Sequence, residues 1–307
     1  MLNLSRVCVP ITLDCNLKCK YCYRNAGMRD IPEFSKEMLN YLENLSPNTT
    51  EAVIASGGEP LLYPNKIKQL FERVPDGIHK KIMSNASELT EEILEYINEN
   101  NIELSISHDG EMSTFLTGYD SLLDPEVAPL IRKVKKLHIS GVCTKYNPNP
   151  WKNYQDTLKK FGKERTFNYT PVLLFEGESV KAVSEGLNYD EYFKGYWECK
   201  LNNVERPYWL YKRVPRKFSE NLNVLPNGEI VGMTKINHTY GTIHSTIEEI
   251  REAKQKLGDY DKCIGCSKKG VCNIPSQLAS PNYCNTLLKC LDLQEYIREN
   301  RNALYRS

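Results

Sequence analysis

The chain has 307 residues, of which 26% are charged and 40% are hydrophobic, the composition of an ordinary globular protein. The formal net charge of +1 gives no bulk electrostatic attraction to nucleic acid or to an anionic membrane. No apolar stretch approaches the roughly 20 residues that a membrane-spanning helix needs. The N-terminus resembles neither a signal peptide nor a transit peptide. We therefore expect a cytoplasmic protein with neither a nucleic-acid nor a membrane partner.

Strand-like and helix-like segments alternate over residues 5–175, which is typical of βα units around a parallel sheet. We expect strands over residues 7–12, 52–56, 81–84, 102–107, 137–144 and 167–175. Helices are predicted over residues 35–45, 66–73 and 90–98. The pattern predicts the α/β class and a partial (β/α)6 barrel, in which functional residues lie at the C-terminal ends of the strands.

A connector and a smaller C-terminal cysteine-rich, auxiliary-cluster domain follow the barrel. The connector is predicted to be irregular, and its aromatic residues either pack inward or contact substrate; they are Tyr189, Tyr192, Phe193, Tyr196, Trp197, Tyr208, Trp209 and Tyr211. A hairpin over 221–233, a helix over 246–257, a cysteine-rich knuckle over 260–284 and a final helix over 286–302 are expected next. The predicted domains are 1–176 (barrel), 177–220 (connector) and 221–307 (C-terminal domain).

Eleven cysteines are unusual for a chain expected in a reducing compartment, and their clustering indicates metal binding. Cys15, Cys19 and Cys22 form Cys-x3-Cys-x2-Cys directly after the first predicted strand. Three thiolates can occupy three irons of a [4Fe–4S] cubane and leave the fourth iron open for chemistry. A structural zinc site is the alternative, although zinc usually takes four ligands.

This loop resembles the signature of the radical S-adenosylmethionine (radical SAM) superfamily, including the aromatic Tyr21 immediately before the third cysteine. The resemblance implies that S-adenosylmethionine chelates the open iron through its amino group and carboxylate. Reductive cleavage then releases methionine and a 5′-deoxyadenosyl radical, which abstracts a hydrogen atom from the substrate. In that case Cys15, Cys19 and Cys22 hold the catalytic cluster, and Tyr21 is one of the cofactor-binding residues.

Three further positions are similar to cofactor-binding elements of the family. Gly57, Gly58 and Glu59 follow the second strand and look like the Gly-Gly-Glu motif that binds the amino group of the methionine moiety. Asn85 ends the third strand and is expected to contact the adenosyl portion, and Ser107 ends the fourth within a Ser-x-Asp-Gly element. Without the resemblance, the first motif reads as a turn, and Asn85 and Ser107 read as strand caps.

Cys263, Cys266 and Cys272 form Cys-x2-Cys-x5-Cys, followed by Cys284 and Cys290. This second cysteine cluster resembles the SPASM domain of peptide-modifying radical SAM enzymes. Two of that family's cysteine positions carry Met233 and Ser276 instead, so the ligands of one auxiliary cluster are missing. We expect one closed auxiliary [4Fe–4S] cluster, with a four-cysteine zinc knuckle as the alternative. Its predicted ligands are Cys263, Cys266, Cys272 and Cys284, with Cys290 a weaker candidate for the fourth.

The remaining cysteines have no predicted metal. Cys8 and Cys143 lie inside predicted strands and are expected to be small core residues. Cys199 lies in the aromatic connector, where a surface thiol is the default expectation.

The resemblance favours an oxidoreductase that modifies a peptide or protein side chain. An enzyme acting on a small molecule, such as a sugar, nucleoside or amino acid, is the alternative, and a non-catalytic iron–sulfur or zinc scaffold is a minor one. Because the barrel begins almost at residue 1, we expect no N-terminal leader-recognition domain. A separate recognition protein is then a candidate partner, beside an electron donor of the flavodoxin or ferredoxin type.

Overall fold

One continuous sheet organises the described part of the chain. The structure is a computed structural model and describes residues 2–22, 30–162, 167–173, 183, 186–202, 204, 222–232 and 237–257. Within these residues nine strands form one sheet in the order β6-β5-β4-β3-β2-β1-β7-β8-β9. The strands are β1 (Arg6–Thr12), β2 (Ala52–Gly57), β3 (His79–Ser84), β4 (Glu103–Ser107), β5 (Leu137–Cys143), β6 (Asn168–Leu173), β7 (Leu222–Val224), β8 (Glu229–Gly232) and β9 (Thr239–Thr242).

The first six strands are parallel, and each pairs with the next one in the sequence. Strand β7 joins the free side of β1 in parallel, with Cys8 opposite Asn223. Strands β7, β8 and β9 then pair antiparallel. The C-terminal hairpin therefore extends the barrel sheet instead of forming a sheet of its own, and the domain boundaries near 176 and 220 stay predictions.

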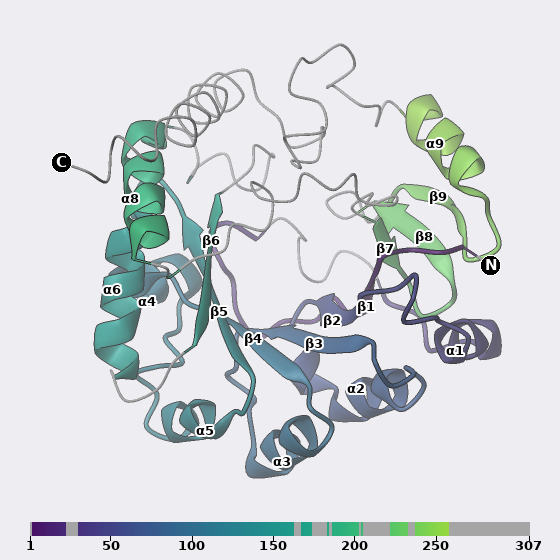
Figure 1. Ribbon diagram of the computed structural model, residues 1–307, viewed down its shortest axis with the longest axis horizontal. Coiled ribbons are helices and arrows are strands. Elements are labelled where there is room, and N and C mark those ends of the chain that lie inside the picture. The colour runs from purple at the N-terminus through teal and green to yellow at the C-terminus, as the bar shows by residue number, and fades with distance from the viewer. Residues whose placement is uncertain are drawn as a thin grey trace, which may run out of the picture.

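Helices cover the outer face of the curved sheet, as Figure 1 shows for α2, α3, α5 and α6. The helices are α1 (Lys36–Glu43), α2 (Pro64–Phe71), α3 (Glu91–Glu99), α4 (Ser113–Thr117), α5 (Val127–Lys133), α6 (Pro150–Phe161), α8 (Tyr189–Leu201) and α9 (Ile247–Lys256), with 3-10 turns η1 (Pro60–Leu62) and η2 (Gly110–Met112). Among the described helices, none is long and apolar enough to cross a lipid bilayer.

Several helices begin at polar caps that the sequence encodes. The side chains of Ser35, Thr90 and Asn149 each accept a backbone N–H in the first turn of α1, α3 and α6. Helix α9 begins with a reciprocal capping box between Thr246 and Glu249. Such caps satisfy N–H groups that have no partner within the helix, so they fix where each helix starts.

The main core lies between the outer helices and one face of the sheet. Val7, Val9 and Ile11 of β1 are fully buried there, and Met38 and Leu42 of α1 pack in the same cluster. Because side chains alternate along a strand, the other face of the sheet points to the inside of the partial barrel. The ends of the parallel strands are thereby held at one common edge.

The barrel prediction is confirmed, since all six predicted strands and three predicted helices are present within a few residues. The hairpin and the helix near 246–257 are confirmed as β7–β8 and α9. The prediction of an irregular connector is wrong over α8, where Tyr192 and Tyr196 are buried. Cys199 is also buried in α8 and is not a surface thiol. Cys143 is buried, as expected of a core residue, whereas Cys8 is half-buried.

Candidate active site

The cysteine loop begins where β1 ends, at the edge formed by the C-terminal ends of the parallel strands. Cys15, Cys19 and Cys22 are half-buried, and all three are free thiols. The Leu17 N–H donates to Cys15 Sγ at 3.5 Å, and the Cys22 N–H donates to the Cys19 carbonyl at 3.1 Å. The loop therefore brings three thiols together on one short, turned segment.

The three thiols are close enough to interact electrostatically. Burial is the main cause that raises the pKa of Cys19 to about 12, and Cys15 and Cys22 raise it further. Because thiolates are the metal ligands, several of them in one loop require a compensating positive charge. In the part of the chain that the structure describes, no three His, Cys, Asp or Glu side chains are arranged to hold a single metal ion. A cubane takes one thiolate per iron, so the three thiols of the loop match the ligands of a cluster with one open iron.

Gly57 and Gly58 hold the first half of the loop by close backbone contact. The Gly58 N–H donates to the Thr12 carbonyl at 2.8 Å, and the Glu59 N–H donates to the Asp14 carbonyl at 2.7 Å. A Cβ on Gly57 would lie 1.9 Å from the Thr12 oxygen, and one on Gly58 would lie 2.0 Å from the Asp14 oxygen. Both positions therefore require glycine, and Gly57 also has a φ of +126°.

The Glu59 carboxylate is fully buried and accepts three hydrogen bonds. Its Oε1 accepts from the Leu61 N–H (2.9 Å) and from Ser84 Oγ (2.7 Å), while Oε2 accepts from the Asn85 N–H (2.7 Å). Burial raises the pKa of Glu59, and these donors act against that rise. Glu59 thus ties the segment after β2 to the end of β3 and keeps one acceptor position on Oε2.

Asn85 links the loop after β3 to the cysteine loop. Its side-chain Nδ2 donates to Asn16 Oδ1 at 3.1 Å, and Asn16 Nδ2 donates to Ser87 Oγ and to Glu88 Oε1, each at 2.8 Å. Burial raises the pKa of the Cys15 thiol, and the nearby Asn85 side chain acts against this rise. The first half of the cysteine loop is therefore attached to both β2 and β3.

Tyr21 attaches the second half of the loop to the segment after β4. Its hydroxyl donates to Asp109 Oδ2 at 2.6 Å, and the neighbouring Lys20 N–H donates to the Leu116 carbonyl at 2.8 Å. Burial raises the pKa of Asp109 to about 6, although the bonds from Tyr21 and from the Val142 N–H oppose this. Sequence reasoning missed Asp109 as a site residue, although it is the third residue of the Ser-x-Asp-Gly element.

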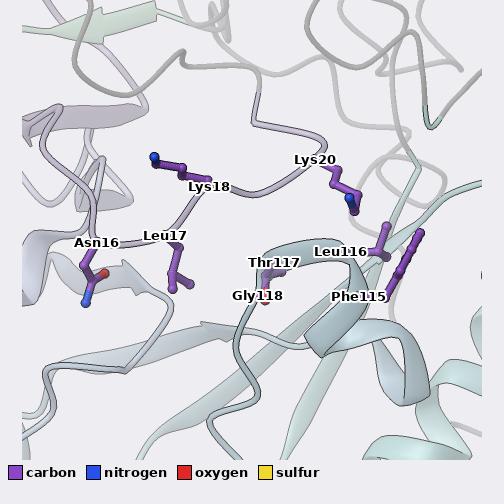
Figure 2. Close-up of a pocket in the computed structure, with 8 residues that line it drawn as sticks. All are labelled: Asn16, Leu17, Lys18, Lys20, Phe115, Leu116, Thr117 and Gly118. Carbon is purple, nitrogen blue, oxygen red and sulfur yellow. The ribbon is translucent and has the colours of Figure 1, made fainter.

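A pocket of about 280 Å³ opens between the cysteine loop and the end of α4 (Figure 2). Its lining residues are Asn16, Leu17, Lys18, Lys20, Phe115, Leu116, Thr117 and Gly118. Ser107 is exposed at the end of β4, immediately before this segment. The structure thus places the cysteine loop, Gly57–Glu59, Asn85 and Ser107 at one edge of the sheet, as the sequence predicts.

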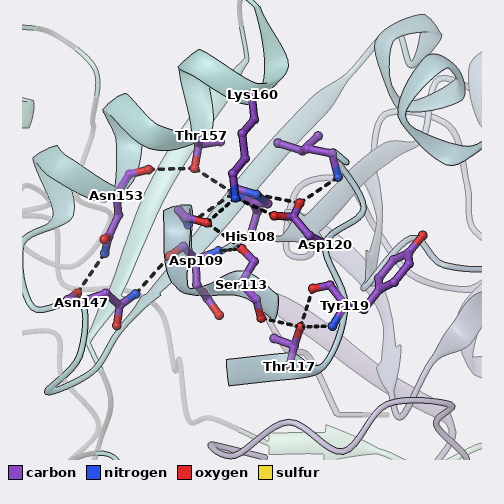
Figure 3. Close-up of polar contacts among 12 residues, drawn as sticks. His108, Asp109, Ser113, Thr117, Tyr119, Asp120, Asn147, Asn153, Thr157 and Lys160 are labelled. Atoms are coloured by element: carbon purple, nitrogen blue, oxygen red, sulfur yellow. Dashed lines mark hydrogen bonds and ion pairs between the residues drawn. The ribbon is translucent and has the colours of Figure 1, made fainter. Parts of the chain in front are cut away.

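A buried polar cluster joins the segment after β4 to helix α6 (Figure 3). His108 Nε2 lies 3.1 Å from Asp120 Oδ1, and Lys160 Nζ lies 2.6 Å from Asp120 Oδ2. His108 Nδ1 lies 2.8 Å from Thr157 Oγ1. Burial alone would raise the pKa of Asp120, but His108 and Lys160 lower it to about 2. These groups pair with one another, so they fix α6 against the end of β4.

The residues predicted to hold the auxiliary cluster lie outside the described residues. They are Cys263, Cys266, Cys272, Cys284 and the weaker candidate Cys290. Met233, Ser276, the predicted final helix and the connector residues Tyr208, Trp209 and Tyr211 lie outside them too.

Residues 9–111 match the family model described as the Radical SAM superfamily. The matched segment contains all three cysteines of the loop, Gly57–Glu59, Asn85 and Ser107. This part of the chain, with its parallel sheet and its cysteine loop at the C-terminal edge, is thus similar to the radical SAM superfamily.

Two curated relatives align with part of the chain. An uncharacterized protein of Methanocaldococcus jannaschii is 33% identical over 125 residues, which are 38% of this chain and 43% of the relative. The cysteine-type anaerobic sulfatase-maturating enzyme of Clostridium novyi is 30% identical over 128 residues, which are 36% of this chain and 33% of that enzyme. The similarity thus spans less than half the length of each of these relatives.

Solved structures share the fold over most of the chain. The structure of anSMEcpe with bound AdoMet superimposes with a TM-score of 0.65 at 19% identity. The match covers 99% of this chain and 98% of the anSMEcpe chain. Streptococcus suis SuiB bound to S-adenosylmethionine has a TM-score of 0.61 at 14% identity, and the match covers 88% of this chain and 72% of the SuiB chain. Both proteins were also solved with peptides, Kp18Cys and the precursor peptide SuiA. At these identities the likeness shows a common fold.

Proposed function

We propose that this protein is a radical SAM enzyme that holds one [4Fe–4S] cluster on Cys15, Cys19 and Cys22. One observation carries the proposal: three free, half-buried thiols share a loop that is bonded to the Gly57–Glu59 segment, within the part that matches the superfamily. When bound, the cluster and S-adenosylmethionine supply a 5′-deoxyadenosyl radical that abstracts a hydrogen atom from the substrate.

The residues around the loop suit a cationic ligand. Glu59 and Asp109 are both fully buried, and their hydrogen-bond donors are backbone amides and hydroxyl groups. The ammonium and sulfonium groups of S-adenosylmethionine would be attracted to such an edge. Glu59 Oε2, which accepts from the Asn85 N–H, is proposed to accept from the ammonium as well, beside the carbonyl groups of Gly57 and Gly58.

Three other residues complete the proposed cofactor contacts. The Tyr21 hydroxyl is engaged by Asp109, so Tyr21 would contact the cofactor through its backbone. Asn85 lies beside Cys15 and is proposed to contact the adenosyl portion. Ser107 is exposed at the end of β4 and is proposed to reach the same cofactor.

We propose a peptide or protein side chain as the substrate. Support comes from the sulfatase-maturating relative and from the structural neighbours that hold Kp18Cys and SuiA. A small molecule stays the alternative outcome of the test. A flavodoxin- or ferredoxin-type protein is the proposed electron donor, and a separate leader-recognition protein is a further candidate partner. The free thiols agree with the reducing cytoplasm as the proposed location.

For the C-terminal segment we propose a second [4Fe–4S] cluster on Cys263, Cys266, Cys272 and Cys284. The ligand count is complete for a closed cluster, which would serve electron transfer or structure. Zinc is the alternative occupant of the same four thiolates.

Anaerobic reconstitution followed by metal analysis tests both metal assignments. Two clusters require about eight irons and eight sulfides per chain. Replacing Cys15, Cys19 and Cys22 together by Ala should remove half of them. A wild-type protein with about four irons and one zinc would exclude only the auxiliary cluster.

Cofactor cleavage and substrate class are tested on the reconstituted protein. With dithionite it should convert S-adenosylmethionine slowly to 5′-deoxyadenosine and methionine, and the triple Cys→Ala variant should not. A peptide such as Kp18Cys should increase this conversion and change its own mass. If only sugars, nucleosides or amino acids are altered, the peptide assignment fails while the radical chemistry stands.

A further inference from the structure

The cysteine loop is attached at two separate places, to the segments after β2 and β3 and to the segment after β4. Its first half, residues 14–16, bonds to the segments after β2 and β3. Its second half bonds to the segment after β4, through Lys20 to the Leu116 carbonyl and through Tyr21 to Asp109. Because the two attachments are separate, a substitution at one of them can release one half of the loop without releasing the other.

The Tyr21–Asp109 contact is buried on both sides. Tyr21 is 9% exposed and packs with Leu116 and Val183, and Asp109 is fully enclosed. A hydroxyl that donates to a buried carboxylate at 2.6 Å makes a short, charge-assisted bond. Such a bond constrains direction as well as distance, so it fixes where the tyrosine lies.

Asp109 is itself fixed in place by its other contacts. Its Oδ1 accepts from the Val142 N–H at 2.7 Å, so the carboxylate is held to the end of β5. Its own N–H donates to Ser113 Oγ at 2.8 Å, and its carbonyl accepts from Asn147 Nδ2 at 3.3 Å. An acceptor held this way cannot follow the tyrosine if the loop moves.

We propose that Tyr21 and Asp109 form a latch that positions the second half of the cysteine loop, and with it Cys19 and Cys22. Tyr21 lies between these two cysteines, whereas Cys15 belongs to the half that is held by Asn16 and the Gly58–Glu59 backbone. Asp109 acts through Tyr21 and is a positioning residue. The benefit for cluster binding rests on the proposed function, but the latch is a property of the chain without metal.

The latch is tested on the full chain without iron, kept reduced and anaerobic. N-ethylmaleimide is added, and mass spectrometry follows the alkylation of each cysteine. Tyr21→Phe removes the hydrogen bond and leaves the Asp109 charge in place. It should speed the alkylation of Cys19 and Cys22 roughly tenfold, because losing one buried bond favours local opening. Alkylation of Cys15 should stay at the wild-type rate.

Tyr119→Phe is the matched control, because the Tyr119 hydroxyl donates to Asp124 Oδ2 at 3.0 Å, a bond that involves no residue of the cysteine loop. It should leave all three alkylation rates unchanged. Equal acceleration at Cys15 in Tyr21→Phe, or no acceleration at Cys19 and Cys22, would overturn the latch.

Asp109→Asn and Asp109→Ala grade the effect at equal charge. The asparagine oxygen still accepts one hydrogen bond, so the alkylation rate of Cys22 in Asp109→Asn should lie between the rates in the wild type and in Asp109→Ala. In reconstituted protein, the same order should appear in the rate at which a chelator removes iron. If the wild-type chain takes up no iron, the proposed function fails, while the alkylation experiment still decides the latch.

Discussion

The two ends of strand β4 carry carboxylates in opposite surroundings, a half-buried one at Glu103 and a fully buried one at Asp109. Glu103 begins the strand, and Lys81 Nζ lies 2.8 Å from its carboxylate, with His79 and His138 at 3.5 and 3.7 Å. Burial alone would raise the pKa of Glu103, but these neighbours lower it to about 2. Asp109 follows the other end, where burial raises its pKa to about 6.

The difference separates an end whose charges are paired within the chain from the end at which we propose that the cofactor binds. At the Glu103 end, the charges compensate one another within the chain. At the Asp109 end, Glu59 and Asp109 are held by neutral donors beside three thiols, which leaves unfavourable negative charge for a cationic group to offset. Functional residues of barrels lie at the C-terminal ends of the strands, in agreement with this division.

The largest expected effect comes from Gly58→Ala, which places a Cβ 2.0 Å from the Asp14 carbonyl oxygen. The cysteine loop must move away from Gly58, so the free energy of unfolding should fall by about 3 kcal/mol. The proposed [4Fe–4S] cluster on the loop should be lost as well. Thermal unfolding and iron content measure the two effects.

Gly118→Ala is the control, since Gly118 has a φ of +83° but no atom within 4 Å of an added Cβ. Backbone strain alone should lower the free energy of unfolding by about 1 kcal/mol there and leave the iron content unchanged. Equal effects of the two substitutions would show that close contact at Gly58 is unimportant.

Glu59→Gln and Glu103→Gln compare the two ends directly. The Gln amide N–H2 group cannot accept a hydrogen bond, so Glu59→Gln leaves at least one of its buried donors without a partner. The expected loss of stability is roughly 1–3 kcal/mol, together with weaker S-adenosylmethionine binding. Glu103→Gln should lower stability and leave cofactor affinity unchanged. Calorimetric Kd values check this, and an unchanged Kd in Glu59→Gln would restrict Glu59 to a structural role.

The Glu103 end should make stability depend on pH. Burial, followed by the charge of Lys81, lowers the pKa of His138 to about 4, and the pKa of Glu103 is about 2. Both values lie below those of the unfolded chain, so the unfolded state binds more protons as the pH falls. Stability should be complete above about pH 6.5 and decrease by roughly 1–2 kcal/mol by pH 5, mainly through His138. Denaturant unfolding of His138→Gln should show a flatter dependence, and an identical slope would contradict this assignment.

The fold was predictable from local patterns. Short apolar runs such as Ala52–Ser56, separated by capped amphipathic helices, predicted the parallel strands in their correct order. Helix α8 was missed although its aromatic residues recur at the three- and four-residue spacing of one helix face, at positions 189, 192, 193, 196 and 197. That two of these aromatics and Cys199 are buried depends on packing against other elements, which spacing does not report.

The site was predictable where its chemistry is local in sequence. Three cysteines within eight residues stand out in the sequence alone, and the Gly57–Glu59 element was predicted from its resemblance to a family motif and its place after a predicted strand. Asp109, by contrast, reaches Tyr21 across 88 positions, and Asn16 reaches Glu88 across 72. Such contacts follow from the register of the sheet, which brings the ends of β1, β3 and β4 together.

The smallest effect is expected from a substitution at Asn16, which attaches the first half of the cysteine loop to the segment after β3. Asn16→Ala removes two exposed donors to Ser87 and Glu88 and the acceptor for Asn85. Water replaces much of what is lost at an exposed site, so the free energy of unfolding should fall by only about 0.5–1 kcal/mol. Alkylation of Cys15 should nevertheless become faster, while Cys19 and Cys22 keep their wild-type rates because Tyr21 still bonds to Asp109. This is the reverse of the pattern expected for Tyr21→Phe. If Asn16→Ala instead exposes all three thiols together, the cysteine loop moves as one unit and its two attachments are not independent.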